Sequence, residues 1–496
     1  MKEANTWEAD PCDRSRRENV IELIGEDLWE KAEGAEALLL LIDYRMKDAA
    51  GDHQYGISRL FIFDALYGKK PLTRFAAGIL TPALWALSGA KHRSVPKAKQ
   101  RLTFSNTFLL SARYPAARAQ IERETGCTAV LAFSDLLKLE GEDQRINLKG
   151  SLKLKHYGVR PIFFRGRSVC GSALEKAVVR YCDLVYDAAV PESEKTKEDL
   201  EKAVLALKDA YLKRVEKAEE CLRKEDCGMY ITVNQYNLRD LLVIHACKNL
   251  GVRTLQQEHH TIQFCQDQFD ENRAKPRLSF AGEYGFWNRM ELEFHRKVYF
   301  FDSMLYPAEE VRMHVTGNPE MVFEQAERYR QAYPPERKLT YMTAILENWQ
   351  DPEIRESYLK WRWDIYKGLK ELAERQHILI NIRYRPFSEQ EFREKEIPVL
   401  KEWGFRISES LPENLMEDLC SSSVIMSATS SVLSTARLFG KLTYRVEDLS
   451  FRNRLMDTEV HDVSVAEIPD IVIPEGIENT PQEIDREGTF NIRNLF

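Results

Sequence analysis

Residues 423–441, SVIMSATSSVLSTARLFGK, run from a short apolar stretch through a group of hydroxyl side chains into an apolar pattern with helical spacing. They predict a strand at residues 423–426, a turn that carries Ser430 and Ser431, and a helix from Val432. In an open parallel sheet, ligands bind beyond the carboxyl ends of the strands, where free N–H groups of the following helix point toward them. We therefore predict that Ser430 and Ser431 bind the phosphate of a nucleotide without a metal ion; the alternative is an ordinary serine helix cap.

A second candidate lies at the end of the preceding strand pattern. Residues 377–382, HILINI, predict a strand that ends at RYRP, residues 383–386. A guanidinium group can bind two oxygens of a phosphate or carboxylate at once. We predict that Arg383 or Arg385, with Pro386 beside it, faces the crevice that holds the two serines; the alternative is that both arginines lie on the surface.

The rest of the chain alternates between strand-like and helix-like patterns. Short apolar stretches separated by amphipathic segments indicate the βαβ order of a parallel sheet, so we predict the α/β fold class. The predicted strands are residues 37–44, 127–133, 159–164, 229–233, 252–256, 339–344, 377–382, 405–407 and 423–426. The predicted helices include residues 193–226, residues 239–250, and a helix that begins at Asp351-Pro352-Glu353.

The chain has 496 residues, which is more than one ordinary hydrophobic core can hold. Strand patterns stop at Gly317-Asn318-Pro319, give way to a charged segment, and start again near residue 339. We therefore predict an N-terminal, acceptor-side Rossmann-like domain at residues 1–325 and a C-terminal, nucleotide-donor-binding Rossmann-like domain at residues 335–496. An open alternative is that the last segment of the chain crosses back to the N-terminal domain.

Composition narrows the classes of partner. Hydrophobic residues make up 44% and charged residues 30% of the chain, which is typical of a globular protein. The net charge is −7, with acidic and basic residues interspersed, so we expect no nucleic-acid partner. The nine cysteines form no CxxC pair, which argues against a disulfide framework and a zinc knuckle. We expect a cytoplasmic protein.

One apolar stretch suggests a membrane contact. Residues 75–87 are apolar and have Lys69 and Lys70 before them and Lys91, His92 and Arg93 after them. The stretch is shorter than the roughly 20 residues that a spanning helix needs. Two interpretations stay open: a buried helix, or a patch that docks peripherally on the inner face of the plasma membrane.

A third candidate site follows the strand at residues 252–256. Glu258, His259 and His260 come at its end, where an imidazole with a pKa near neutrality could act as a general base. Adjacent side chains on a strand point in opposite directions, so at most one histidine would be catalytic. The alternative is a solvated histidine pair, and a metal site is not expected because the chain has neither an HxxxH nor a DxD motif.

The order of these motifs resembles the glycosyltransferases of the GT-B fold. The motifs are EHH (258–260), VTGNPEM (315–321), RYRP (383–386) and VIMSATSSVLSTARLFGK (424–441), and the resemblance covers roughly residues 229–446. The most similar subgroup contains bacterial capsule and wall-polymer enzymes: CDP-glycerol glycerophosphotransferases, Kdo transferases and bacterial sialyltransferases. The resemblance implies two Rossmann-like domains that face each other across a cleft.

The resemblance also implies roles for individual residues. His259 matches the histidine of the family's QHG motif, and Arg385 with Pro386 matches a His-Pro pair. The remaining matches are Ser430 and Ser431 with the donor-phosphate pair, Gly317, Asn318 and Pro319 with the interdomain turn, and Gly440 and Lys441 with the Gly-Lys after the helix.

This sequence departs from the family pattern at three places. Glu258 and His260 replace the glutamine and glycine, which would alter the acceptor side. Arg385 replaces the histidine, which would keep phosphate binding through a different cation. Thr435 stands where the family usually has a glutamate, a carboxylate that meets a ribose in many relatives, so the donor would differ.

The activity that the resemblance implies is a metal-independent transfer of a sugar or polyol phosphate from a cytidine- or uridine-nucleotide donor, CMP-linked or otherwise. The acceptor would be a glycan or a lipid-linked glycan in bacterial capsule polysaccharide or cell wall biogenesis. No cofactor is expected, because the nucleotide-activated donor is itself a substrate. Two alternatives stay open: a catalytically silent nucleotide-sugar-binding or scaffold subunit of a capsule assembly complex, and a nucleotide-sugar 2-epimerase.

Overall fold

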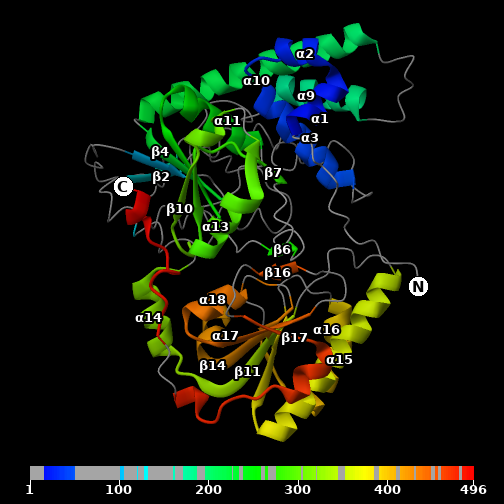
Figure 1. The fold of residues 1–496 in the computed structure, drawn as a ribbon, viewed down its shortest axis with the longest axis vertical. Helices are drawn as coiled ribbons and strands as arrows, with labels where there is room; N and C mark the ends of the chain where they lie inside the picture. The colour runs from blue at the N-terminus through cyan, green and yellow to red at the C-terminus, as the bar shows by residue number, and fades with distance from the viewer. Residues whose placement is uncertain are drawn as a thin grey trace, which may run out of the picture.

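A computed structural model gives the arrangement of the chain as two α/β units, one above the other in Figure 1. The structure describes residues 16–50, 101–104, 120, 128–131, 160–161, 171–186, 196–225, 227–233, 238–258, 263–265, 275–302, 305–319, 321–343, 352–384, 390–408, 414–428, 430, 432–447, 453–455, 460–479 and 483–495. The apolar stretch at residues 75–87 lies outside these residues. Within them, no helix is both long enough and apolar enough to span a bilayer.

The N-terminal unit is built on a seven-stranded parallel sheet with the order β10-β8-β5-β4-β1-β2-β3. Its strands are β1 (Arg101–Phe104), β2 (Thr128–Leu131), β3 (Arg160–Pro161), β4 (Cys227–Thr232), β5 (Arg253–Gln257), β8 (Glu283–Phe286) and β10 (Arg312–Val315). The chain runs outward from β1 to β3, then returns to the other side of β1 and continues outward from β4. This reversal is the strand order of a Rossmann-like fold.

A layer of helices covers this sheet at the top of Figure 1. It contains α1 (Arg16–Ile24), α2 (Glu26–Lys31), α3 (Glu36–Ala50), α9 (Gly171–Val185), α10 (Lys197–Glu225) and α11 (Leu238–Asn249), and α13 (Arg289–Val298) lies lower, beside β10. Helix α10 presents one apolar stripe to α9 and α11 and keeps its charged face outward, as its spacing predicts.

The strand predicted at residues 37–44 is wrong, because these residues lie in helix α3. All five side chains from Leu38 to Ile42 are fully buried among neighbouring helices. A continuous apolar run is compatible with a strand buried on both faces or a helix buried on all sides, and periodicity alone does not separate the two.

The C-terminal unit contains a six-stranded parallel sheet with the order β13-β12-β11-β14-β15-β17, again the Rossmann order. Its strands are β11 (Glu336–Met342), β12 (Leu379–Arg383), β13 (Arg406–Ser408), β14 (Ser422–Ser427), β15 (Leu442–Val446) and β17 (His461–Val463). Its helices are α15 (Pro352–Gln376), α16 (Gln390–Glu402), α17 (Leu415–Ser421), α18 (Val432–Leu438) and the 3-10 helices η4 (Val465–Asp470) and η5 (Ile477–Asn479). The predicted fold class, α/β with two Rossmann-like domains, is confirmed.

The two units are joined twice. After β10 the chain passes through α14 (Phe323–Ala332) into β11, so a helix covers the stretch between the two predicted domains. The end of the chain then runs back past α14 to β10 and finishes in η6 (Ile492–Leu495) (Figure 1). Smaller elements complete the description: β6 (Gln263–Cys265), β7 (Lys275–Leu278), β9 (Tyr299–Asp302), η2 (Ala308–Glu310) and β16 (Asn453–Leu455).

Candidate functional site

Each sheet has one point at which the strand order reverses, and such points are where open α/β sheets bind ligands. In the C-terminal sheet the reversal lies between β11 and β14, whose carboxyl ends pair at Met342 and Ser427. In the N-terminal sheet it lies between β1 and β4, which pair at Phe104 and Ile231. The topology alone therefore nominates two ligand-binding edges, one in each domain.

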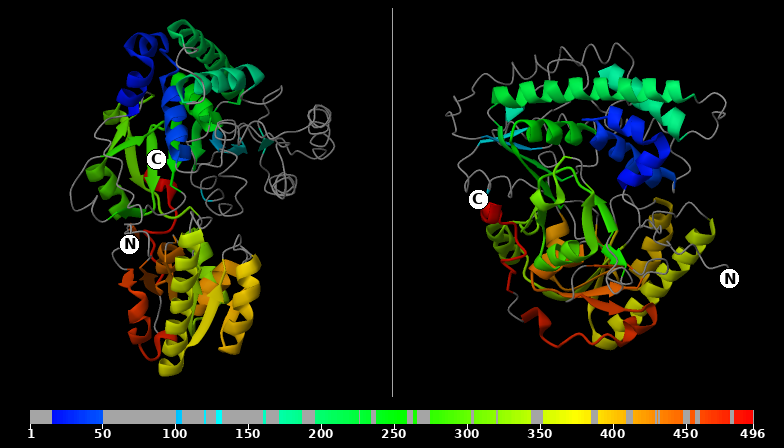
Figure 2. Two further views of the ribbon diagram at one scale, coloured as in Figure 1. Left: turned by 90° about the vertical axis from the view of Figure 1, so that its right-hand side faces the viewer. Right: turned by 45° about the horizontal axis from the view of Figure 1, so that its top comes forward.

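These two carboxyl edges face each other. Strand β6, which follows β5 of the N-terminal sheet, pairs antiparallel with β16, which follows β15 of the C-terminal sheet, and this pair lies between the domains (Figure 1). The left view of Figure 2 shows the same two domains, one above the other. A second contact joins the same edges: the Asn318 side chain, just beyond β10, donates to the Thr435 hydroxyl of α18 at 3.3 Å. A ligand held at one edge can therefore approach a ligand held at the other.

The C-terminal edge is fixed by short polar contacts. The Ser427 hydroxyl donates to the Met342 carbonyl at 2.9 Å, and the Thr343 N–H donates to the Arg383 carbonyl at 3.0 Å. All four residues are buried. The ends of β12, β11 and β14 therefore form a rigid platform under the segments that carry the predicted donor-binding residues.

Ser430 comes directly beyond this platform, two residues before α18. Its hydroxyl accepts a hydrogen bond from the Val432 N–H at 3.3 Å, its carbonyl accepts one from the Leu433 N–H at 3.1 Å, and its side chain is half-buried. The position agrees with the strand-turn-helix order that the sequence predicts, and the hydroxyl also makes the capping contact of the alternative interpretation. Ser431 lies outside the described residues.

Arg383 occupies the last position of β12 and is 6% exposed. Its guanidinium donates to the Asp418 carboxylate at 2.6 Å. Asn381 and Ser408 donate to the other oxygen of the same carboxylate at 3.2 and 2.8 Å. The structure thus places Arg383 in an ion pair within its own domain; Arg385 and Pro386 lie outside the described residues.

Beneath the end of β12 lies a buried network that the sequence analysis missed. The hydroxyl of Tyr384, the residue before Arg385, donates to the Glu396 carboxylate at 3.1 Å, and the Tyr366 hydroxyl donates to the same oxygen at 3.0 Å. Arg362 forms an ion pair with the other oxygen of Glu396. Burial raises the pKa of Tyr384 and keeps its hydroxyl protonated. The network anchors the start of the RYRP segment. Its one signal in the sequence was the charged Arg362 within the helix predicted to begin at Asp351.

On the N-terminal side, Glu258 follows the last residue of β5 and is 5% exposed. Its carbonyl accepts hydrogen bonds from Trp287 Nε1 at 2.9 Å and Gln257 Nε2 at 3.1 Å, and its N–H donates to the Gly285 carbonyl at 2.9 Å. The start of the EHH segment is therefore held at the carboxyl edge, as predicted for a strand end. His259 and His260 lie outside the described residues.

The Gly317-Asn318-Pro319 turn lies at the junction of the domains and is buried. Gly317 has a φ of 76°, in the left-handed region that glycine adopts without strain. The Asn318 N–H donates to the Gly488 carbonyl at 2.8 Å, and its side chain makes the contact with Thr435 described above. Thr435, the departure from the family's glutamate, is 3% exposed and takes part in this contact between domains.

Among the residues the structure describes, no three His, Cys, Asp or Glu side chains lie close enough to hold a metal ion. At the two carboxyl edges, the described residues that could take part in a reaction include Ser430, with its hydroxyl, and Glu258, with its carboxyl group. Main-chain N–H groups lie there as well. The predicted reaction also requires a histidine, His259 or His260, and Arg385, and all three lie outside the described residues.

No family profile matches the sequence, and no curated protein matches it. The chain is similar to several solved structures. The MurG structure of Acinetobacter baumannii matches with a TM-score of 0.35 at 10% identity, over 77% of this chain and 89% of that one. The UDP-GlcNAc 2-epimerase of Methanocaldococcus jannaschii matches with a TM-score of 0.43 at 9% identity, over 80% and 97% of the two chains. A glycosyltransferase of Rickettsia africae matches with a TM-score of 0.36 at 9% identity, over 71% and 81%.

The strand orders of the two sheets and the contacts between their carboxyl edges define the fold. Two Rossmann-order sheets with their carboxyl edges turned toward each other make up the GT-B arrangement that the sequence predicts. The chain has a GT-B fold.

Proposed function

We propose that the protein is a metal-independent glycosyltransferase or polyol-phosphate transferase that uses a nucleotide-activated donor. The observation that carries the proposal is the meeting of two ligand-binding edges: each Rossmann-order sheet has its strand-order reversal on an edge that faces the other domain. Such a pair of edges suits a two-substrate reaction, with the donor on one domain and the acceptor on the other.

On the donor side, we assign the nucleotide phosphate to the loop that follows β14. Ser430 lies there, Ser431 and Arg385 are the further predicted ligands, and the Met342–Ser427 platform beneath keeps the loop in place. Preorganised donors of this kind stabilise the negative charge that develops on a departing nucleotide.

On the acceptor side, we assign the general base to His259, with Glu258 and His260 beside it. His259 would remove the proton of an acceptor hydroxyl while that oxygen attacks the donor. The new bond forms at the sugar carbon or at the polyol-linked phosphorus, and the bond to the leaving nucleotide breaks. The segment starts at the fixed carbonyl of Glu258 and is followed by β6, which pairs with the donor domain. This connection supports a place between the substrates.

The motif order supports the finer assignment to bacterial surface polysaccharide synthesis, with a cytidine or uridine nucleotide as donor and a glycan or lipid-linked acceptor. The protein would then work in the cytoplasm, with its acceptor at the inner face of the plasma membrane. The motifs that support this assignment resemble those of the CDP-glycerol, Kdo and sialic acid transferases.

Thermal shift with CMP, CDP, UDP and GDP tests the donor site, because a bound product raises the melting temperature by mass action. The variant Ser430→Ala should reduce the shift given by the best nucleotide. Ser464→Ala is the matched control, since Ser464 caps the short helix η4 beyond the edge strand β17, away from the strand-order reversal. An equal loss in both variants, or no shift with any nucleotide, contradicts the proposed donor site.

Incubation with nucleotide-activated donors then separates the activities. Release of free nucleotide together with a modified acceptor supports a transferase. Interconversion of UDP-GlcNAc with its 2-epimer would identify an epimerase, and nucleotide binding without turnover of any donor would identify a silent subunit.

A further inference from the structure

The C-terminal sheet has one apolar face and one polar face. Leu339, Tyr341, Ile380 and Ile382 of the central strands β11 and β12 point into the main hydrophobic core of the domain. The alternate positions on β11, β12 and β13 carry polar side chains instead: Lys338, Thr340, Asn381, Arg383, Arg406 and Ser408. Buried parallel sheets are normally apolar on both faces. The polar face therefore calls for a physical explanation.

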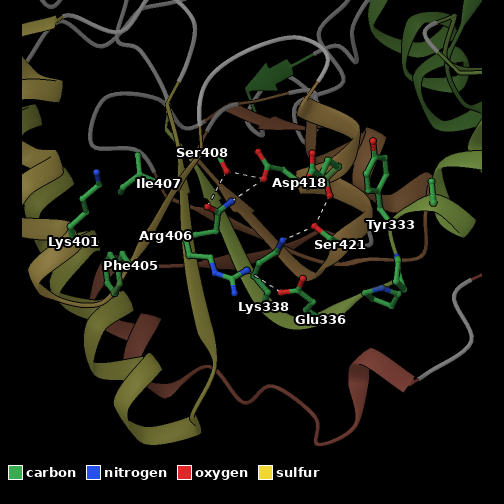
Figure 3. A pocket seen from close by; sticks show the side chains of 15 residues that line it. Tyr333, Glu336, Lys338, Lys401, Phe405, Arg406, Ile407, Ser408, Asp418 and Ser421 are labelled. Atoms are coloured by element: carbon green, nitrogen blue, oxygen red, sulfur yellow. Dashed lines mark hydrogen bonds and ion pairs between the residues drawn. The ribbon is translucent and has the colours of Figure 1, made fainter.

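A pocket of about 590 Å³ lies on this polar face (Figure 3). Phe405 and Tyr333 stand at opposite sides of it, while Lys338, Asn381, Asp418 and Ser421 belong to its more deeply buried lining. Helix α17 covers part of the face, but it has only seven residues. The volume is in the range of pockets that bind small molecules.

Of the six charged side chains that line the pocket, three form ion pairs with described residues: Glu336, Arg406 and Asp418. Asp418 is neutralised by Arg383 at 2.6 Å, although Arg383 itself is not among the lining residues. At the exposed rim, Arg406 pairs with Glu336 at 3.2 Å. These two ion pairs leave the ammonium group of Lys338 as the charge to be explained in the buried part of the lining.

Lys338 is 5% exposed. Its ammonium group donates to the Ser421 hydroxyl at 2.5 Å, and no carboxylate of the described residues lies within ion-pair distance of it. Burial lowers the pKa of Lys338, with partial compensation from nearby carboxylates. An ammonium group has three N–H donors, and burying one without a counter-ion is unfavourable. A ligand that brings a negative charge into the pocket would offset that cost.

We propose that this pocket is a second ligand site, which binds a small molecule through a phosphate or carboxylate group held by Lys338 and Ser421. The site lies on the face of the sheet, under α17, and is separate from the donor site at the carboxyl edge. Asn381, Ser408 and the aromatic side walls provide hydrogen-bonding and apolar surface for the rest of the ligand.

A second buried lysine offers a matched control. Lys441 is 3% exposed, and burial lowers its pKa to about 8. Its ammonium group donates to the Cys420 carbonyl at 2.6 Å, at the end of the same helix α17, and it does not line the pocket. Lys441, like Lys338, is thus held by a hydrogen bond, but its partner is a main-chain carbonyl at a helix end, where a cation is favourable, and not a group of the pocket lining.

The test is calorimetric titration of the full chain with inorganic phosphate and, separately, with citrate, at an ionic strength held constant with sodium chloride. The wild type should bind at least one of them, and the comparison tells a phosphate site from a carboxylate site. Lys338→Met should weaken that binding roughly 10- to 100-fold, the effect of losing a hydrogen bond to a charged group. Lys441→Met should bind the anion as the wild type does.

Melting temperature without the anion separates a ligand site from a structural lysine. Lys338→Met should melt at or above the wild-type temperature, because methionine removes a buried charge that has no ion-pair partner among the described residues and keeps the volume. Lys441→Met should melt lower. The proposal is overturned if neither anion binds the wild type, if Lys338→Met binds it unchanged, or if Lys338→Met is destabilised or does not fold. Because Ser430→Ala reports on the donor site, failure here leaves the proposed function standing.

Discussion

Replacing Gly317 with alanine should loosen the junction between the two domains. A Cβ atom on Gly317 would lie 2.1 Å from the carbonyl oxygen of Thr489, in the returning C-terminal segment. Gly404 provides the control: its φ is +82°, close to the +76° of Gly317, but no atom lies within 4 Å of the position of its Cβ. The comparison of Gly317→Ala with Gly404→Ala therefore isolates the contact from the backbone conformation.

The expected loss in the free energy of unfolding follows from the backbone conformation at residue 317 and from the hydrogen bonds that a Cβ atom there would break. An alanine in the left-handed region costs roughly 1–2 kcal/mol at either position. At residue 317 the C-terminal segment must also move, and it is held by three main-chain hydrogen bonds that contribute about 1 kcal/mol each. They join Asn318 N–H to the Gly488 carbonyl, Phe490 N–H to the Met321 carbonyl and Asn491 N–H to the Thr316 carbonyl. We expect Gly317→Ala to lose about 3–5 kcal/mol and Gly404→Ala about 1–2 kcal/mol.

Urea denaturation measures the two losses, and limited trypsin digestion reports the location. Arg486 and Arg493 lie in the returning segment, so its release should speed cleavage at these sites in Gly317→Ala alone. An equal loss of stability in the two variants, or an unchanged rate of cleavage in Gly317→Ala, would refute the view that the returning C-terminal segment holds the interdomain turn in place.

Three further outcomes are expected. His259→Ala should lower the transfer rate roughly 10²- to 10⁴-fold with nucleotide affinity nearly unchanged, whereas a larger loss in His260→Ala would move the general base to that residue. Burial alone would raise the pKa of Glu283, but hydrogen bonds from Arg253 and His314 lower it to about 2. The contribution of Glu283 to the free energy of unfolding is therefore complete above about pH 5 and is lost as the pH falls toward 2. In urea titrations, Glu283→Gln should lower the free energy of unfolding by roughly 2–3 kcal/mol at pH 7 and by progressively less at acid pH. Arg362→Met should cost about 3–5 kcal/mol because it leaves Glu396 buried without its ion-pair partner, and adding Glu396→Leu should recover much of that loss in the same assay.

The parallel strands were the most predictable part of the fold. Residues 229–233, 252–256 and 423–426 each fall on a strand of the structure, because short β-branched and aliphatic stretches between turn residues have few other stable arrangements. Residues 37–44, ALLLLIDY, are also aliphatic but have Ile42 as their one β-branched residue, and they form a helix that is buried among helices from distant parts of the chain. A local sequence pattern predicts a helix or strand correctly only where the packing partners of that element can be inferred from the same pattern.

The pocket could not be predicted from the sequence for a related reason. ERKLTYM, residues 336–342, reads as an ordinary strand with a charged start. Lys338 is buried with no carboxylate of the described residues within ion-pair distance. This burial depends on α17, whose residues come more than 70 positions later and whose shortness leaves the face partly uncovered. Neither the burial of Lys338 nor the shortness of α17 can be predicted from the sequence around residue 338.

Arg383 shows how a long-range contact changes the interpretation of a motif. The sequence presents Arg383 as a cation at a strand end, free to meet a phosphate. Its ion-pair partner Asp418 is 35 residues away, on a helix that packs over the sheet, and the pair is buried. For Arg383 to hold a donor phosphate, that ion pair would have to open, and the buried carboxylate would keep, among the described residues, Asn381 and Ser408 as its donors. Removing one partner of such a pair is strongly unfavourable. The role of Arg383 in donor binding stays a prediction, and donor binding through Arg385 is the hypothesis that does not require this ion pair to break.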